Sequence, residues 1–557
     1  MPRSVAVALC LSLAFATTTH AAQGERGVVA AEHALASRVG LEVLEKGGNA
    51  IDAAVATAFA VCVVHPSSCG IGGGGFLVAY LADQKRALAL DFRETAPRGA
   101  RRDMYVRDGK VDPKLSRSGG LAVAVPGEVR GLAQALEQHG TISLAAALAP
   151  AIHLARSGFP VSAHLARAIT RNRDEIAQRP LLARHLLRPD GTPHRQGDEI
   201  AFPELAKTLE TIARDGPDAF YEGTIAASIA KHVRAAGGIL TAADLADYEP
   251  VWREPLAPDV RAYRVLPMPP PSSAGVLLQV MGVLAPDDLA DLTPTSPAYA
   301  HLLTEAMKHG FADRARVYGH PMGRDDGIAA LLAPENLAAL RKRIAADAVG
   351  ARDDYGSAAA AAPPPTDGGT AHLSVIDRHG NAVACTTTIN TAFGSMVVAG
   401  ETGIILNNQM DDFSAQPGAP NVYGLVGAEA NAIAPGKRPL SSMSPTILTR
   451  DDAAVVAAGG SGGPLIITAT LQSILDVIVF GMDAATAVAT PRLHHQWLPA
   501  MLAVEPEIPE ATRAALQKRG HQLREIGAMG AVQLVRRTAD GVEGASDPRK
   551  GGQAAAW

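Results

Sequence analysis

The feature that most constrains the fold of this chain is a joint at Thr370, where a linker-like sequence changes to a strand-like one. Residues 356–366 are rich in alanine and proline and have little to bury, which is typical of an exposed linker. Directly after Thr370 the sequence alternates like a strand, from His372 to Ile376. A hydroxyl residue at such a joint can attack the preceding Gly369 carbonyl and release itself as a new chain end. The α-amine of that end has a reference pKa of about 7.7–8.0, which suits a base for its own hydroxyl. Read alone, the position also fits an ordinary loop threonine before a strand.

The residues that follow predict a β-hairpin. A turn cluster at 377–381 separates strand-like runs at 370–376 and 382–388. Facing residues of a hairpin have a constant index sum, so this turn places Thr388 opposite Thr370, within one position. We therefore expect a second hydroxyl beside the candidate nucleophile, where it can hold the amine or the hydroxyl in place.

The rest of the chain mixes helices and strands. Helical spacing runs from Ala30 to Lys46, and Ile51–Val64 predicts a second, nearly all-apolar and therefore buried helix. Residues 76–80 and 87–92 predict paired core strands. From about 121 to 346 the sequence is mostly helical, and it becomes rich in strands again after the joint.

Composition excludes several classes of protein. The 557 residues are 47% hydrophobic and 19% charged, as in an ordinary globular chain with a substantial core. The net charge is −5 and the basic residues are scattered, so nucleic acid and anionic membrane surfaces are poor candidate partners.

The first residues predict export. Arg3, an apolar run over 5–16 and small residues up to Ala22 are typical of a secretory signal peptide spanning residues 1–21. We expect a periplasmic or secreted protein without a membrane anchor. Removal of the signal leaves Cys62, Cys69 and Cys385, an odd number that implies no disulfide framework, although Cys62 and Cys69 could pair.

Several motifs, in order and spacing, resemble the γ-glutamyltransferase (γ-glutamyl transpeptidase) family across essentially the whole mature chain. They are Val64–Pro66, Gly70–Gly75, Asp91–Pro97, Met268–Gly275, Thr370, Thr388–Asn390, Asn407–Ser414, Pro439–Thr446, Gly462–Gly463 and Gly544–Arg549. The resemblance implies an α+β fold, the four-layer αββα sandwich of N-terminal nucleophile hydrolases. It also implies a precursor cut before Thr370 into a large subunit, 22–369, and a small subunit, 370–557, which stay together as a heterodimer.

The resemblance also implies roles for individual residues. Thr370 is the nucleophile, Thr388 lies beside it, and Gly462 and Gly463 form the oxyanion hole. A γ-glutamyl group presents an α-carboxylate, for which the planar fork of an arginine is a suitable bidentate donor, and an α-ammonium. The residues assigned to these two groups are Arg93, Ser441 and Ser442 for the carboxylate and Asp412, Asn390 and Gln409 for the ammonium, with Tyr423 as a lid. The substrates implied are glutathione, other γ-glutamyl compounds and amino acid or dipeptide acceptors, with neither cofactor nor metal.

Other interpretations compete with this one. Gly459–Gly463 matches the G-x-S-x-G elbow of serine hydrolases, with Asp476 and His494 following in the order of a triad, but it leaves Thr370 and Thr388 unexplained. A glutaryl (cephalosporin) acylase of the same superfamily is closer, although its substrate has no α-ammonium for Asp412 to bind. A catalytically inactive homologue is a further alternative, but it would not need to keep the nucleophile, the two oxyanion glycines and the substrate-binding residues together. The run Gly72–Gly75 leads into a strand, which disfavours a phosphate loop, and the pair at 494–495 fits buried structure better than a metal site.

Overall fold

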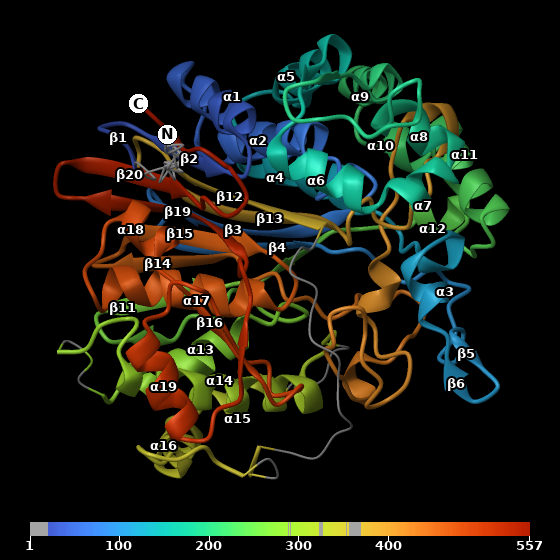
Figure 1. Cartoon of the computed structure of the whole chain (residues 1–557). Coiled ribbons are helices and arrows are strands. Elements are labelled where there is room, and N and C mark those ends of the chain that lie inside the picture. Colours follow the sequence, from blue (N-terminus) through green and yellow to red (C-terminus); the bar gives the residue numbers. More distant parts are fainter. Residues whose placement is uncertain (1–20, 288, 290, 322–326, 352–353, 356–368) are drawn as a thin grey trace, which may run out of the picture.

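The computed structural model describes residues 21–287, 289, 291–321, 327–351, 354–355 and 369–557. The linker at 356–366 and residues 1–20 of the predicted signal peptide lie outside the described residues. Two seven-stranded sheets face one another, and helices cover the outer face of each (Figure 1). The predicted four-layer αββα sandwich is therefore confirmed.

The first sheet contains the hairpin around Thr370, and all its pairs are antiparallel. Its order is β21 (Ala555–Ala556), β2 (Val28–Ala31), β12 (Gly369–Ile376), β13 (Ala382–Asn390), β3 (Gly74–Leu81), β4 (Arg86–Phe92) and β9 (Val251–Arg253). Helices α1 (Ala34–Glu45), α2 (Ala50–Val64) and α4 (Glu128–His139) pack on its outer face. Helix α2 is buried on every side because α5 (Leu144–Ser157) covers it in turn.

The second sheet is also antiparallel throughout. Its order is β1 (Ala22–Gly24), β20 (Gly541–Ser546), β19 (Ala531–Thr538), β15 (Ala453–Ser461), β14 (Thr446–Arg450), β11 (Tyr263–Pro267) and β10 (Asp259–Val260). Its outer layer is built from α13 (Ala274–Leu284), α14 (Pro297–Val317), α17 (Leu465–Ile478) and α18 (Ala484–Ala489). Apolar side chains from both sheets, including Phe76, Ile447 and Val535, fill the space between them.

The remaining elements are peripheral. The helices are α3 (Pro113–Arg117), α6 (Ala163–Arg171), α7 (Arg173–Ala177), α8 (Pro180–Leu186), α9 (Pro203–Asp215), α10 (Asp218–Tyr221), α11 (Gly223–Ala235), α12 (Ala242–Ala246), α15 (Ile328–Leu331), α16 (Pro334–Arg343) and α19 (Glu510–Lys518). The short strands are β5 (Val106–Arg107), β6 (Lys110–Val111), β7 (Phe159–Pro160), β8 (Glu199–Ile200), β16 (Leu493–His494), β17 (Leu502–Val504) and β18 (Leu523–Glu525). No helix in the described ranges has both the length and the apolar character needed to cross a bilayer.

Segments before and after Thr370 alternate across the sheets. In the first sheet β12 and β13 lie between β2 and β3, so two strands that follow the joint are hydrogen-bonded on both sides to strands that precede it. In the second sheet β20, β19, β15 and β14 lie between β1 and β11. The two halves of the chain therefore share both sheets.

Most local predictions agree with these elements. The buried helix at 51–64 and the paired strands at 76–80 and 87–92 are confirmed. The hairpin is confirmed with its register, because Thr370 pairs with Thr388. The helix predicted over 30–46 is wrong at its start, since residues 28–31 form β2 and α1 begins at Ala34.

Candidate active site

The hydroxyls of Thr370 and Thr388 meet beside the Gly369 carbonyl. Thr388 Oγ1 donates to Gly369 O at 2.7 Å and accepts from the Asn390 N–H at 2.8 Å. A hydroxyl has one hydrogen, so the 3.0 Å contact between the two Oγ1 atoms is donated by Thr370. Thr388 therefore both polarises the carbonyl that precedes Thr370 and orients the hydrogen of the Thr370 hydroxyl.

The backbone at this joint is irregular. The ladder shifts register between Gly369 and Thr370, and Asn390, opposite Gly369, has a left-handed φ of 79°. A Cβ on Gly369 would lie 2.2 Å from Thr391 O and 3.0 Å from Ser67 O. Only glycine fits this position, and its carbonyl is held where the Thr388 hydroxyl reaches it.

The predicted oxyanion residues form a turn between β15 and α17. Gly462 and Gly463 have φ values of 124° and 60°, in the region that favours glycine. Among the described residues, neither N–H is engaged in a hydrogen bond. Gly463 lines the same cavity as Thr370, whereas Gly462 lines a neighbouring one. Free N–H groups at the start of a buried helix can stabilise a developing oxyanion.

A cavity beside Thr370 collects nearly all the predicted substrate-binding residues. Its walls are Arg93, Thr370, Thr388, Asn390, Gln409, Asp412, Tyr423, Ser441, Ser442, Met443, Gly463 and Ile466. Its free volume is about 20 Å³, room for about one water molecule. The uncut chain therefore holds this site in a closed form.

Arg93 and Asp412 close the cavity by pairing with each other. Arg93 Nη2 lies 2.5 Å from Asp412 Oδ2, and Arg93 is only 1% exposed. The same guanidinium donates to the carbonyls of Pro439 and Leu440 at 3.2 and 3.3 Å, which fixes its plane. The site thus presents one cation and one anion side by side, 319 residues apart in sequence.

The two adjacent acids have different roles. Asp411 accepts from Ser116 Oγ at 2.5 Å and from the Val422 N–H at 2.9 Å, so it anchors the loop that carries Tyr423. Burial raises the pKa of the Asp411 carboxyl. Asp412 instead faces the cavity.

Gln409 leaves one acceptor unused beside Asp412. Its Nε2 donates to Asp412 Oδ2 at 2.7 Å, while its buried Oε1 has no partner among the described residues. A buried acceptor without a donor is costly unless a ligand supplies one. Asn390 also lines the cavity, and its Nδ2 donates to Asn408 O at 3.0 Å.

The loop with Ser441 and Ser442 is fixed from behind by the segment before α13. Ser272 Oγ donates to Met443 O at 2.7 Å and Ser273 Oγ to Ser441 O at 2.6 Å. Tyr423 also lines the cavity. Its hydroxyl donates to Asn390 O at 2.6 Å.

Two buried acids, Glu94 and Glu128, have raised carboxyl pKa values. Burial raises the pKa of the Glu94 carboxyl to about 8, although Arg93 lies only 3.7 Å away and opposes the shift. Burial raises the pKa of Glu128 to about 8 as well. Of the acids near Arg93, Asp412 makes the shortest contact with its guanidinium.

Lys550 and Glu32 are the main site neighbours that sequence reasoning missed. Lys550 Nζ donates to Thr370 O at 2.6 Å and to Ser461 Oγ at 3.1 Å, and it pairs with Glu32 at 2.7 Å. Lys550 directly follows the Gly544–Arg549 motif, which was the available signal. Nothing in the local sequence of Glu32 indicated its position.

The serine-elbow interpretation is wrong. Ser461 contacts Lys550, whereas the His494 ring nitrogens contact Thr468 Oγ1 at 2.9 Å and Gln496 Oε1 at 3.0 Å. Asp476 lies inside α17, where burial raises the pKa of its carboxyl to about 8. No triad can form from these residues.

Other predicted features have structural explanations. A Cβ on Gly73 or Gly75 would come within 2.0 or 2.1 Å of a carbonyl of β13, so this glycine run permits close strand packing. Cys62, Cys69 and Cys385 are buried free thiols. Among the described residues, His301, Glu305 and His521 could offer metal ligands within 4.8 Å of one another, but Glu305 is already paired with Lys308 at 2.6 Å.

Comparison with known proteins agrees with this geometry. The chain is 42% identical over 535 residues to the glutathione hydrolase proenzyme of Escherichia coli K12, covering 95% of this chain and 91% of that one. It is 38% identical over 514 residues to the proenzyme of the same name from Bacillus subtilis 168, covering 90% and 85%.

Two solved structures are also similar. A cephalosporin acylase from Bacillus halodurans has a TM-score of 0.86 at 30% identity and covers 98% of both chains. A γ-glutamyltranspeptidase from Helicobacter pylori has a TM-score of 0.56 at 38% identity and covers 57% of this chain and 91% of that one. The family model described as gamma-glutamyltranspeptidase matches residues 36–557. The chain therefore belongs to the gamma-glutamyltranspeptidase family.

Proposed function

We propose that this protein is an exported γ-glutamyltransferase and glutathione hydrolase that matures by cutting itself before Thr370. The observation that carries the proposal is the cavity in which Arg93 and Asp412 face each other beside the Thr370 and Thr388 hydroxyls. Among common acyl groups, γ-glutamyl carries a carboxylate and an ammonium on one carbon, which matches this pair of opposite charges. The names of the E. coli and B. subtilis relatives support the same activity.

Donor binding replaces one ion pair by two. The α-carboxylate takes the place of Asp412 at the Arg93 guanidinium, and the α-ammonium takes the place of Arg93 at Asp412. The ammonium also supplies the hydrogen that the buried Gln409 Oε1 lacks. Because the zwitterion has no net charge, the exchange leaves no buried charge unpaired. Tyr423 must move to admit the donor, since the closed cavity holds only about 20 Å³.

Maturation uses the contacts at the joint. Thr370 Oγ1 attacks the Gly369 carbonyl carbon, and Thr388 donates to the carbonyl oxygen as it becomes negative. The C–N bond between Gly369 and Thr370 breaks, and the nitrogen keeps the hydroxyl proton as part of a free α-amine. Water then hydrolyses the ester and releases fragments 22–369 and 370–557.

Turnover repeats this chemistry on the substrate. The neutral α-amine of Thr370 takes the proton of its own hydroxyl as Oγ1 attacks the γ-carbonyl carbon. The N–H groups of Gly462 and Gly463 receive the oxyanion. The α-amine of Thr370 passes that proton to the leaving-group amine of the substrate, which departs. The γ-glutamyl group, now an ester on Thr370, is then transferred to water or to the amine of an acceptor.

One experiment tests both cleavage and turnover. Intact mass and Edman analysis of purified protein should find a fragment 370–557 beginning Thr-Ala-His-Leu, and the preparation should hydrolyse glutathione. Thr370→Ala should stay uncut and inactive, while Ser461→Ala should still cleave. An uncut chain with full activity, or cleavage that depends on Ser461 and not on Thr370, would overturn the proposal.

A glutaryl (cephalosporin) acylase is the second candidate, because the structure titled cephalosporin acylase from B. halodurans is similar over 98% of this chain. Glutaryl groups have the carboxylate but no ammonium, so they would leave Asp412 at the cavity wall without a cation once Arg93 turns to the substrate. We therefore expect glutaryl substrates to be poor.

A further inference from the structure

Side chains take over from a strand along the edge of β12 next to Thr370. The ladder between β2 and β12 covers Leu373–Ile376 and ends there. Beyond it, Glu32 Oε1 accepts from the His372 N–H at 3.3 Å. Lys550 Nζ donates to Thr370 O at 2.6 Å. A carboxylate and an ammonium therefore occupy the positions where main-chain groups of a longer β2 would lie.

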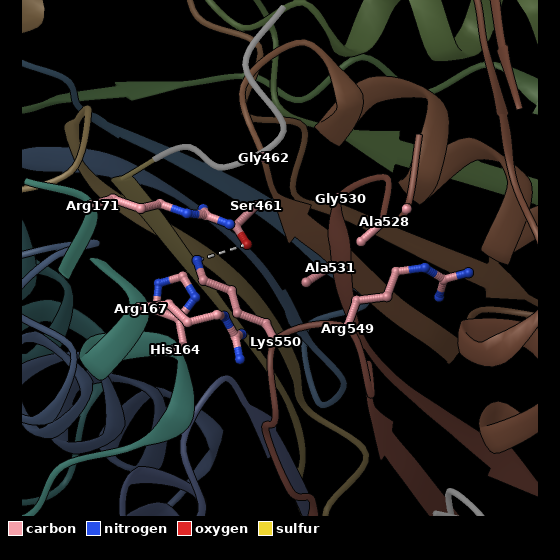
Figure 2. A pocket seen from close by; sticks show the side chains of 11 residues that line it. His164, Arg167, Arg171, Ser461, Gly462, Ala528, Gly530, Ala531, Arg549 and Lys550 are labelled. Atoms are coloured by element: carbon pink, nitrogen blue, oxygen red, sulfur yellow. Dashed lines mark hydrogen bonds between the residues drawn. The ribbon is translucent and has the colours of Figure 1, made fainter. Parts of the chain in front are cut away.

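The ammonium of Lys550 is held from several sides. Besides Thr370 O, it donates to Ser461 Oγ at 3.1 Å and forms an ion pair with Glu32 Oε2 at 2.7 Å. Figure 2 shows Nζ beside Ser461, with the Arg549 guanidinium turned in another direction. The Lys550 side chain lines a cavity of about 480 Å³ but is only 6% exposed. Its contacts therefore fix the ammonium, and the Thr370 carbonyl with it.

This contact brings a positive charge close to the nitrogen of Thr370. The N–H and C=O of one strand residue point to the same edge of the strand. The nitrogen and oxygen of an extended residue lie about 3 Å apart, so Lys550 Nζ is within about 6 Å of the nitrogen that cleavage turns into an α-amine. Glu32 contacts the strand two residues further along, at His372. Of this ion pair, the cation therefore contacts the residue that carries the amine.

The charge of Lys550 also acts on its titratable neighbours. Burial lowers the pKa of His65 and of His164, and the positive charge of Lys550 lowers both further. Burial lowers the pKa of His33, which follows Glu32, to about 4. The three histidines are therefore uncharged at neutral pH, and Lys550 is a source of positive potential at this edge of the sheet.

Other charged groups around the joint are either paired within the protein or exposed. A partner of opposite sign reduces the field of a paired charge, and counterions screen an exposed one. Lys550 differs from them because it contacts Thr370 directly. These other groups are Arg93 with Asp412 in the donor cavity, Arg549 with Glu505, and the exposed Arg167 and Arg171 on α6.

We propose that Lys550 positions Thr370 for turnover: its ammonium holds the Thr370 carbonyl, and its positive charge keeps the freed α-amine unprotonated. The inference rests on the proposed function, in which that amine is the base. A second positive charge beside the ammonium is unfavourable, so the amine binds a proton less readily than it would without Lys550. Lys550 acts through Thr370 and is a positioning residue.

Removing the charge of Lys550 should move the rising limb of the acylation rate to higher pH. For a charge within about 6 Å in a partly solvated site, with Glu32 opposing it, the expected shift is about one pH unit. A rate that needs the free base falls about tenfold per pH unit below its midpoint. Acylation at about pH 6.5 should therefore be about tenfold slower, while rates at about pH 9.5 should be nearly equal.

The assay is the first release of 4-nitroaniline from γ-glutamyl 4-nitroanilide by mature protein, without acceptor, across this pH range. The leaving group has no carboxylate, so a direct ion pair between Lys550 and the substrate does not enter the comparison. Lys550→Gln removes the charge and keeps a hydrogen-bond donor, whereas Lys550→Arg keeps both. Lys550→Gln/Glu32→Gln removes both members of the buried pair, so neither charge is left unpaired.

The matched control is Lys308→Gln/Glu305→Gln. It removes another buried ion pair, at 2.6 Å, whose lysine lines a different cavity. Both variants that lose the Lys550 ammonium should show the shifted limb with a plateau near that of the wild type. Lys550→Arg and the control should keep the wild-type midpoint.

Three results would overturn this inference alone, provided that the wild type shows the rising limb. They are an unmoved midpoint in Lys550→Gln/Glu32→Gln, an equal shift in the control, and a shift of that size in Lys550→Arg. If both variants without the ammonium stay uncut while Lys550→Arg matures, the role of the charge is overturned, because the ammonium is then needed before the amine exists. A wild-type acylation rate that does not depend on pH would overturn the proposed base together with this inference.

Discussion

Replacing Thr388 by valine removes the hydroxyl that links Thr370, the proposed nucleophile, to the Gly369 carbonyl that we propose it attacks, with almost no change in side-chain volume. The lost contacts are the donation to Gly369 O at 2.7 Å and the contact with Thr370 Oγ1 at 3.0 Å. Loss of one oxyanion donor costs about 2.7–4 kcal/mol in the transition state, or about 10²–10³ in rate. The Asn390 N–H also loses its acceptor, which costs about 1–3 kcal/mol of folding stability.

The assay is a denaturing gel that follows conversion of purified precursor into two fragments. We expect Thr388→Val to mature at least about 100-fold more slowly than wild type, and Thr388→Ser to mature at a similar rate to wild type. Thr386→Val is the matched control, because its hydroxyl lies on the same strand and bonds His372 Nδ1 at 2.8 Å, away from the nucleophile. Maturation of Thr388→Val at the wild-type rate, or equal slowing in Thr386→Val, would refute the role given to this hydroxyl.

Four further predictions concern other parts of the site. Gly369→Ala places a Cβ 2.2 Å from Thr391 O, so precursor cleavage should slow on a gel while any matured enzyme keeps normal kcat/KM; a defect in the matured enzyme would contradict this reading. Asp412→Asn should lower kcat/KM for γ-glutamyl substrates and spare glutaryl ones, because only the former carry the ammonium; equal losses would mark Asp412 as structural. Acylation should rise with pH as the Thr370 α-amine loses its proton, through an apparent pKa near the reference of about 7.7–8.0, and verified acetylation of that amine should abolish turnover. Burial raises the pKa of Glu128 to about 8, so its native carboxyl keeps a proton that the unfolded chain loses, and the free energy of unfolding falls as pH rises from about 4.5 to 8. Glu128→Gln should remove up to about 1.4 kcal/mol per pH unit of that slope in urea titrations at pH 5 to 8; an unchanged slope would show that other groups set it.

Local sequence rules predicted the parts of the fold that local contacts determine. The register of the Thr370 hairpin follows from its turn, and the apolar run Ile51–Val64 predicted the buried helix α2. The start of α1 was missed because residues 28–31 form a strand only by pairing with residues 373–376, more than 340 positions away. Helical spacing within 30–46 carries no information about that partner.

The candidate site was likewise predictable from the sequence only in part. Thr388 beside Thr370 could be derived from the sequence, whereas Arg93 and Asp412 were assigned through the family resemblance. That the two pair with each other in the uncut chain follows only from the three-dimensional arrangement. Lys550 was not predicted, because its contact with Thr370 O depends on how the chain's last strands return to the first sheet.

The alternation of strands before and after Thr370 has a consequence for stability. Cutting the joint leaves the native hydrogen bonds in place, but it turns one chain into two. Unfolding can then separate the two fragments, so refolding becomes a second-order reaction. In the precursor β12 finds β2 as part of the same molecule, whereas the separated fragments must meet by diffusion with edges of sheet exposed. The lifetime of the mature enzyme is therefore governed by how slowly it opens, and its apparent melting temperature should depend on protein concentration and heating rate where that of an uncut Thr370→Ala chain does not depend on concentration.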